Sequence, residues 1–141
     1  MSFKTPIFSD NAPKAIGPYS PAICIDGLVF VSGQLPVNPA TGKIEAESIE
    51  EQTKQSLDNI GALLKEAELD YNNVVKTTVL LADIKDFAAM NAVYSEYFKA
   101  PYPSRSCFQV AALPMGAKVE IEVICARGKI SPETEECGCC E

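Results

Sequence analysis

The first apolar pattern along the chain is a pair of short β-type runs that flank an Asp-Gly dipeptide. The runs cover residues 22–25 and 28–31, and Asp26-Gly27 lies between them. Two residues of this type between apolar runs are a strong signal for a β-hairpin, because its tight turn needs positive φ angles. We therefore predict a hairpin here. A short first strand near residues 3–8 precedes it, and a turn-rich loop over 36–43 follows it.

A helical period replaces the β pattern after Ser48. Ser48 stands three residues before Glu51, which is the arrangement of a capping box and marks the start of a helix. Apolar and small side chains then recur at helical spacing, at Ile49, Thr53, Leu57, Ile60, Leu63, Leu64 and Ala67. A second helix is predicted over residues 86–98. Its stripe is largely aromatic, and core packing is the favoured explanation of that stripe.

The remaining apolar runs predict strands over residues 74–81, 104–110 and 119–126, with a turn over 113–116. The resulting order βββαβαββ indicates an α+β fold, in which a mixed sheet carries both helices on one face. The sheet is rich in apolar side chains, and we expect oligomerisation to bury its second face. The side chains that suggest this are Val75, Val79, Val119, Ile121, Val123 and Ile124.

The length of 141 residues fits one folded domain, which we assign to residues 1–130. Residues 131–141 form an acidic tail that contains Cys137, Cys139 and Cys140. The chain has no apolar run of about 18 residues, so no membrane-spanning helix is expected. Its first residues do not resemble a secretory signal, and a cytoplasmic location is expected.

The charge balance argues against some classes of function. Nineteen acidic and 12 basic residues give a net charge of −7, which is a poor match for phosphate backbones, so nucleic-acid binding is disfavoured. The chain contains no histidine. It therefore cannot form a Ser-His or Cys-His nucleophile pair from its own residues, and it lacks the commonest zinc ligand.

Six cysteines fall into two groups. Cys24, Cys107 and Cys125 lie in apolar, strand-like runs and are interpreted as free thiols that act as small buried hydrophobic residues. The other three lie in the acidic tail, where three thiolates are too few for a closed zinc site. A frayed, reactive tail is favoured over a functional metal site, and no metal is predicted.

Two features carry candidate chemistry. Glu120 and Glu122 alternate along one strand and so point to one face of it, where the pattern alone favours solvated side chains. Arg105 begins an apolar strand in a chain whose other bases, apart from Arg127, are all lysines. A guanidinium binds carboxylates bidentately, so a carboxylate-binding site and a structural ion pair are equally favoured for Arg105.

Six segments, taken together and in order, make the chain similar to the RidA (YjgF) family of imine deaminases over residues 3–129. They are Ile16-Gly17-Pro18-Tyr19-Ser20, Val31-Ser32-Gly33-Gln34-Leu35, Lys76-Thr77-Thr78-Val79, Met90-Asn91, Pro103-Ser104-Arg105-Ser106-Cys107 and Lys118-Val119-Glu120-Ile121-Glu122. The resemblance implies a chorismate-mutase-like fold and a homotrimer with three clefts between neighbouring subunits. It also implies hydrolysis, without a cofactor, of 2-iminobutanoate and 2-iminopropanoate to 2-keto acids and ammonia.

The same resemblance implies roles for individual residues. Arg105 matches the arginine that binds the substrate carboxylate, and Glu120 matches the acid associated with the attacking water. This replaces the interpretation of Glu120 as a solvated side chain. Orientation by Arg105 and one acid–base group would suffice for imine hydrolysis. The other residues matched to the cleft are Tyr19, Ser32, Gly33, Asn91 and Cys107.

Three alternatives stay open at this point. The first is an endoribonuclease or translation inhibitor, against which the charge and the missing histidine weigh. The second is a regulator that binds small carboxylates without turnover. Arg105 would bind the carboxylate in a regulator as well as in an enzyme, so only Glu120 distinguishes the two. The third is a chaperone-like or scaffold role, which would be insensitive to changes at both residues.

Overall fold

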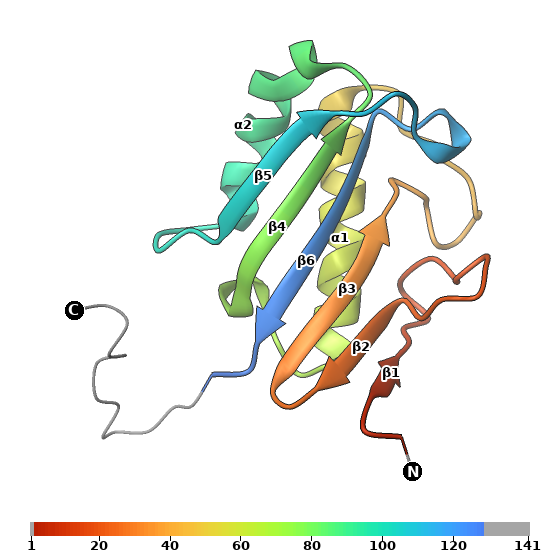
Figure 1. Ribbon diagram of the computed structural model, residues 1–141. Helices are drawn as coiled ribbons and strands as arrows, with labels where there is room; N and C mark the ends of the chain where they lie inside the picture. Colours follow the sequence, from red (N-terminus) through yellow and green to blue (C-terminus); the bar gives the residue numbers. More distant parts are fainter. Residues whose placement is uncertain (1, 129–141) are drawn as a thin grey trace.

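Six strands and two α-helices follow one another in the order that the sequence predicts (Figure 1). The computed structural model describes residues 2–128. Strands β1 (Thr5–Ile7), β2 (Ala22–Ile25) and β3 (Leu28–Gln34) precede helix α1 (Ile49–Glu66), and strand β4 (Val74–Leu81), helix α2 (Phe87–Tyr97), and strands β5 (Ser104–Gln109) and β6 (Val119–Ala126) follow it. Short 3-10 turns, η1 (Tyr71–Asn73), η2 (Ile84–Asp86) and η3 (Pro114–Gly116), join some of these elements.

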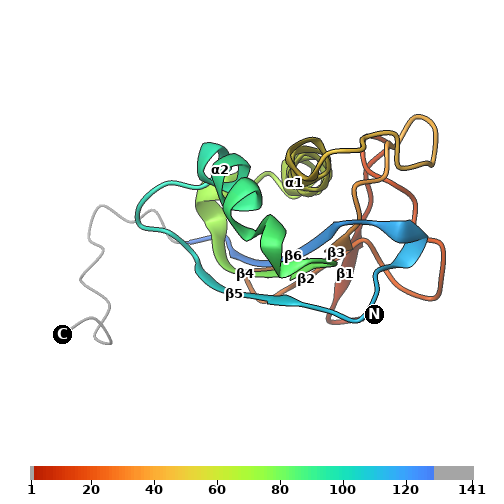
Figure 2. The same ribbon diagram turned by 90° about the horizontal axis from the view of Figure 1, so that it is seen from above.

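The strands form one mixed sheet in the order β1-β2-β3-β6-β4-β5. All neighbours pair antiparallel except β4 and β5, which are parallel and are connected through α2. Both helices pack on the same face of the sheet, as the view from above shows (Figure 2). This confirms the predicted α+β architecture and leaves β5 as an edge strand and one sheet face open.

Local sequence signals account for where the first elements begin and turn. Asp26 and Gly27 both have positive φ, 44° and 79°, as the turn between β2 and β3 requires. At the start of α1, the Ser48 hydroxyl accepts a hydrogen bond of 3.2 Å from the Glu51 backbone amide. The structure therefore contains the Ser48 half of the predicted capping box.

The core lies between the two helices and the covered sheet face. Its fully buried members include Leu57, Ile60 and Leu63 from α1 and Met90 from α2. The aromatic stripe of the second helix contributes to the core as expected, because Tyr94 and Phe98 are 7% and 2% exposed. Phe87 differs, since it is 39% exposed at the start of α2.

The sequence-based argument for burial of the second sheet face used several wrong residues. Val79 pairs with Ile121, and Thr77 with Val123, and all four are buried on the helix-covered face. They are thus core residues, as is Val119. The open face instead carries Phe30, opposite Ile124, and Phe108, opposite Leu80; Phe30 and Phe108 are 42% and 48% exposed. Of the side chains that the sequence indicated, Ile124 lies on the open face and Val75 is 47% exposed, so the prediction was right for these two and wrong for the four core residues.

Cysteine placement follows the expectation in part. Cys125 is buried, while Cys24 and Cys107 are half-buried, and all three are free thiols. The tail cysteines lie outside the described residues. Among residues 2–128, no group of three or more Cys, Asp or Glu side chains is arranged to hold a metal ion. Within the same range, no helix combines the length and apolar character needed to cross a membrane.

Candidate active site

Arg105 lies on the helix-covered side of the edge strand β5. It pairs with Thr77 of the parallel strand β4, and Thr77 is fully buried beneath the helices. The side chain is half-buried, and its Nη1 donates a hydrogen bond of 2.7 Å to Oδ1 of Asn91 on α2. The fold thus brings together two of the residues that the sequence predicted for one pocket.

The Arg105 guanidinium has no carboxylate partner among residues 2–128. The ion pair within this range joins Lys54 and Asp58 on α1. The structural ion pair considered from the sequence is therefore not formed within the described chain. A half-buried cation without a counter-charge is costly unless a ligand compensates it. Arg105 also lines a cavity of about 310 Å³, together with Asn91, Tyr94, Ser95, Tyr102 and Pro103. The site therefore suits an anionic group.

Glu120 lies on the open face of the sheet, opposite Leu80 of β4. It is half-buried, and burial, followed by the nearby charge of Glu122, raises the pKa of its carboxyl above the ordinary value. Its carboxylate packs against Gly33 of β3, since a Cβ built on Gly33 would lie 2.6 Å from Oε1 of Glu120. Any side chain at Gly33 would displace this carboxylate. Partial desolvation makes Glu120 suited to proton transfer nearer to neutral pH than an exposed glutamate.

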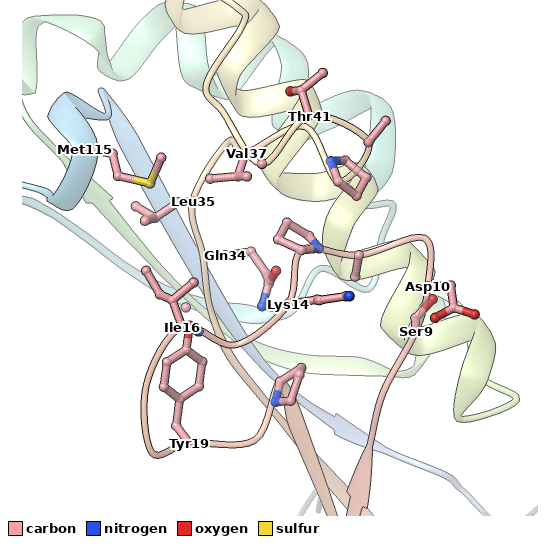
Figure 3. A pocket seen from close by; sticks show the side chains of 17 residues that line it. Ser9, Asp10, Lys14, Ile16, Tyr19, Gln34, Leu35, Val37, Thr41 and Met115 are labelled. Atoms are coloured by element: carbon pink, nitrogen blue, oxygen red, sulfur yellow. The ribbon is translucent and has the colours of Figure 1, made fainter.

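Ser32 precedes Gly33 in β3, and Tyr19 shares a cavity with Gly33. The Ser32 hydroxyl donates a hydrogen bond of 2.6 Å to the carbonyl of Ser20, and so holds the loop that follows Tyr19. Tyr19, which is 50% exposed, and Gly33 line a second cavity of about 410 Å³. Figure 3 shows Tyr19 beside Ile16, whose backbone amide donates to the Tyr19 hydroxyl, with Leu35 and Met115 farther along the cavity.

Within one chain, the predicted site residues lie in two separate groups. Arg105 and Asn91 form one group on the helix-covered face, and Cys107 follows Arg105 on the same side of β5, where it packs against the core. Glu120 is on the opposite face, and its register partner Leu80 lies three residues along β4 from the partner of Arg105. This amounts to about 10 Å along the strand. A small substrate therefore cannot contact both Arg105 and Glu120 of the same chain.

Two aromatic residues near Arg105 were not predicted as part of the site. The Arg105 Cζ atom lies 4.7 Å from the centroid of the Tyr94 ring and 5.5 Å from that of Phe87. Both residues belong to the aromatic stripe of α2, which the sequence assigned to core packing. Its spacing gives no sign of contact with a strand that begins after the helix, so only the folded chain reveals this role.

Most of the chain is similar in sequence to known proteins. The family model described as endoribonuclease L-PSP matches residues 9–127. A goat protein named 2-iminobutanoate/2-iminopropanoate deaminase is 50% identical over 125 residues, which are 89% of this chain and 91% of that protein. An Arabidopsis thaliana protein named Reactive Intermediate Deaminase A, chloroplastic, is 53% identical over 121 residues, which are 86% of this chain and 65% of that protein.

A solved structure shows the same fold. The crystal structure of E. coli TdcF with bound serine superposes with a TM-score of 0.84 at 43% sequence identity. The match covers 88% of this chain and 99% of the E. coli chain. Fold and sequence therefore relate the chain to the same group of proteins over nearly all of its described length.

Proposed function

Because the chain belongs to the endoribonuclease L-PSP family, and relatives about half identical to it are 2-iminobutanoate/2-iminopropanoate deaminases, we propose that it hydrolyses such 2-imino acids to 2-keto acids and ammonia. The protein is an enzyme of the hydrolase class that acts on a C=N bond. The observation that carries the assignment to this site is the half-buried Arg105, which has no carboxylate partner in residues 2–128 and faces a cavity.

Arg105 binds the carboxylate of the substrate. One nitrogen of the guanidinium, Nη1, is already bonded to Asn91, which leaves Nε and Nη2 for the two oxygens of a carboxylate. Bidentate binding fixes both the position and the orientation of the adjacent imine carbon. Much of the acceleration then comes from holding that carbon in place for attack by water.

Glu120 acts on the water. The substrate enters as the protonated imine. The Glu120 carboxylate takes a proton from water as the oxygen adds to the imine carbon, and the electron pair of the C=N bond moves to nitrogen, which gives a neutral amine. The carboxyl group then returns this proton to the amine. The C–N bond breaks and ammonia leaves, while the hydroxyl proton passes to Glu120 as the C=O of the 2-keto acid forms. Ammonia takes that proton as it departs, and Glu120 is again a carboxylate. The raised pKa of Glu120 favours this exchange, because it makes the carboxylate a stronger proton acceptor than an ordinary glutamate.

The complete site requires two chains. We place it in a homotrimer of chorismate-mutase-like subunits, in which Arg105, Asn91 and Cys107 of one subunit face Glu120, Gly33, Ser32 and Tyr19 of its neighbour. Three features support this arrangement. Arg105 and Glu120 lie on opposite faces of one sheet, Arg105 is on an edge strand, and the open face exposes Phe30 and Phe108. Burial of such apolar side chains drives association.

The alternatives considered from the sequence are less well supported. The family description names an endoribonuclease, but a net charge of −7 and the lack of histidine disfavour RNA cleavage here. A regulator that only binds small carboxylates would use Arg105 but would have no need of Glu120. Substitutions of Arg105 and Glu120 therefore distinguish an enzyme from a regulator that only binds carboxylates.

The test of Arg105 measures ammonia release from 2-iminobutanoate, generated in situ by a threonine dehydratase. Arg105→Ala is expected to lower the rate above the uncatalysed background by at least about 100-fold, because the substrate loses its orienting contact. Arg127→Ala is the matched control, since Arg127 donates to the carbonyl of Ala67 and lies in neither cavity. Full activity of Arg105→Ala would contradict the proposal.

The test of Glu120 separates turnover from binding. Glu120→Gln is expected to lower turnover by about 100-fold or more, because the proton acceptor is lost. Binding of the product 2-oxobutanoate, measured by calorimetry, should change little, because Arg105 is intact. Loss of binding together with turnover would instead indicate that Glu120 maintains the shape of the site.

A further inference from the structure

The guanidinium of Arg105 packs against the ring of Tyr94, and a hydrogen bond to Thr77 holds Tyr94 in place. We propose that Tyr94, held by Thr77, is a positioning residue that fixes Arg105 in the orientation in which it receives the substrate carboxylate. The inference rests on the proposed function, since it concerns how the same arginine is prepared for its ligand. Tyr94 acts through Arg105 and has no chemical step of its own.

The Tyr94 ring is within cation–π distance of the arginine. Its centroid lies 4.7 Å from Arg105 Cζ, well inside the limit of about 6 Å for this interaction. The ring is 7% exposed, so little water competes for the guanidinium on that side. Burial also raises the pKa of the Tyr94 hydroxyl, which keeps the ring neutral beneath the cation. A neutral ring supports Arg105 without competing with the carboxylate for its charge.

Tyr94 is held in place at both ends. Its hydroxyl shares a hydrogen bond of 2.8 Å with Oγ1 of Thr77, which is fully buried. Its ring packs against Phe98 with a centroid separation of 4.4 Å, and Phe98 is 2% exposed. The ring therefore has little freedom to move when the substrate enters or leaves.

Thr77 closes the arrangement, because it is also the register partner of Arg105. Strand pairing sets the Arg105 backbone beside Thr77, and the hydrogen bond from Thr77 sets the Tyr94 ring. Thr77, a buried residue, thus fixes both the Tyr94 ring and the Arg105 backbone. Asn91 holds Nη1 in addition. The edge of the guanidinium that carries Nε and Nη2 stays free for the carboxylate.

Holding Arg105 in one orientation has a consequence for substrate binding. Arginine has a long side chain with considerable rotamer freedom, and a preorganised fork loses less entropy when it binds. Removing the ring should therefore weaken binding of substrate and product carboxylates. A residue needed only for folding would instead lower the amount of active protein, which reduces apparent kcat and leaves KM unchanged.

The experiment compares Tyr94→Leu and Tyr94→Phe with the wild type in the full-length protein, using ammonia release from 2-iminobutanoate and calorimetric binding of 2-oxobutanoate. Tyr94→Leu is expected to raise KM and weaken product binding by about 3- to 30-fold, the range of a desolvated cation–π contact. Tyr94→Phe keeps the ring and loses the Thr77 bond, so about 2- to 3-fold is expected, which is close to the loss of one modest hydrogen bond.

Tyr97→Leu is the matched control. Tyr97 lies on the same helix, also packs against the core, and donates to Asp58 rather than contacting Arg105. It should destabilise the protein while leaving KM and product binding of the folded fraction unchanged. If Tyr94→Leu does not fold, Tyr94→Met takes its place, because its flexible, unbranched side chain adapts to an irregular space without supplying a ring. The same rise in KM is expected.

Arg105→Ala makes the possible failures distinguishable. If Arg105→Ala keeps full activity, the role of Arg105 in the proposed function fails. If Arg105→Ala is inactive but Tyr94→Leu, or Tyr94→Met, has the KM and product affinity of the wild type, the positioning proposal alone is overturned. Equal changes in KM for Tyr94→Leu and Tyr97→Leu would also overturn it, because the effect would then be a general one on packing.

Discussion

At the scale of single residues, the environment of Glu120 decides its chemistry. Glu120 and Glu122 alternate with buried residues along β6 and share one face, as the sequence indicates. Glu122 is exposed, whereas Glu120 is half-buried against Gly33. Burial is the larger cause of the raised pKa of Glu120, and the negative charge of Glu122 adds to it. Two glutamates two residues apart thus lie in different surroundings, and the half-buried Glu120 is the one that we propose takes part in catalysis.

Replacing Glu122 should therefore change the pH dependence of catalysis. Glu122→Gln removes a negative charge that opposes ionisation of Glu120, so the pKa of Glu120 should fall. In the proposed mechanism Glu120 must be ionised to accept a proton, so activity is expected to fall as pH drops through its pKa. The acid limb of kcat/KM against pH should thus move to lower pH. Glu66→Gln, on the exposed end of α1, is the control and should leave the limb in place.

At the scale of elements, a tyrosine joins the 3-10 turn η1 to helix α1. The Tyr71 hydroxyl donates a hydrogen bond of 2.7 Å to the carbonyl of Leu57, in the space left by Gly61. The Tyr71 ring also meets Tyr97 edge-on at 5.3 Å, and Tyr97 donates to Asp58 on α1. This contact links α1 with α2, the helix that carries Asn91 and Tyr94.

Gly61→Ala tests the importance of this close approach. Alanine normally stabilises a helix by about 1 kcal/mol relative to glycine. Here a Cβ would overlap the Tyr71 hydroxyl and lie 2.9 Å from its Cζ atom. We therefore expect a net loss of about 1–3 kcal/mol in the free energy of unfolding, as for overpacking in a core. Denaturant unfolding at fixed protein concentration measures it.

The double variant Gly61→Ala/Tyr71→Phe shows whether the tyrosine is the cause. Removing the hydroxyl relieves the closest overlap, so Gly61→Ala should cost less in the Tyr71→Phe background than in the wild type. The same cost in both backgrounds would contradict this explanation.

At the scale of the whole molecule, the sheet separates the two residues of the proposed site. The register places Arg105 opposite Thr77 on the covered face and Glu120 opposite Leu80 on the open face. The sheet therefore stands between the two residues in one chain. In an oligomer, the edge of one subunit can meet the open face of another. Arg105 of the first subunit then lies near Glu120 of the second, and the active unit is the assembly.

Mixed oligomers test this directly. Arg105→Ala and Glu120→Gln, each inactive alone, are co-expressed in equal amounts with different affinity tags, and the mixed species are purified. If each cleft of a trimer takes Arg105 from one subunit and Glu120 from the next, every mixed trimer has one intact cleft, so about one third of the clefts are restored. Ammonia release should recover to a similar fraction of wild-type activity. Mixed oligomers as inactive as the separate variants would contradict a site between subunits.

Much of the secondary structure was predictable because its signals are local. The turn at Asp26-Gly27 and the helix start at Ser48 depend on side chains within three residues of each other. Their conformations need few distant contacts. Arg105 and Glu120 were also found from the sequence, through the residues that surround each of them and the family that these segments resemble.

Sequence by itself thus determined the elements, their order and the residues of interest, because these follow from periodicity and short motifs. Only the tertiary structure decided which sheet face is covered, and hence that Val79 and Ile121 are core residues. It also decided that Tyr94 lies beneath Arg105, and that Arg105 and Glu120 face apart. Alternation along a strand separates two faces but does not say which one the helices cover. That choice depends on strand order and register, which are set by contacts between segments far apart in the chain.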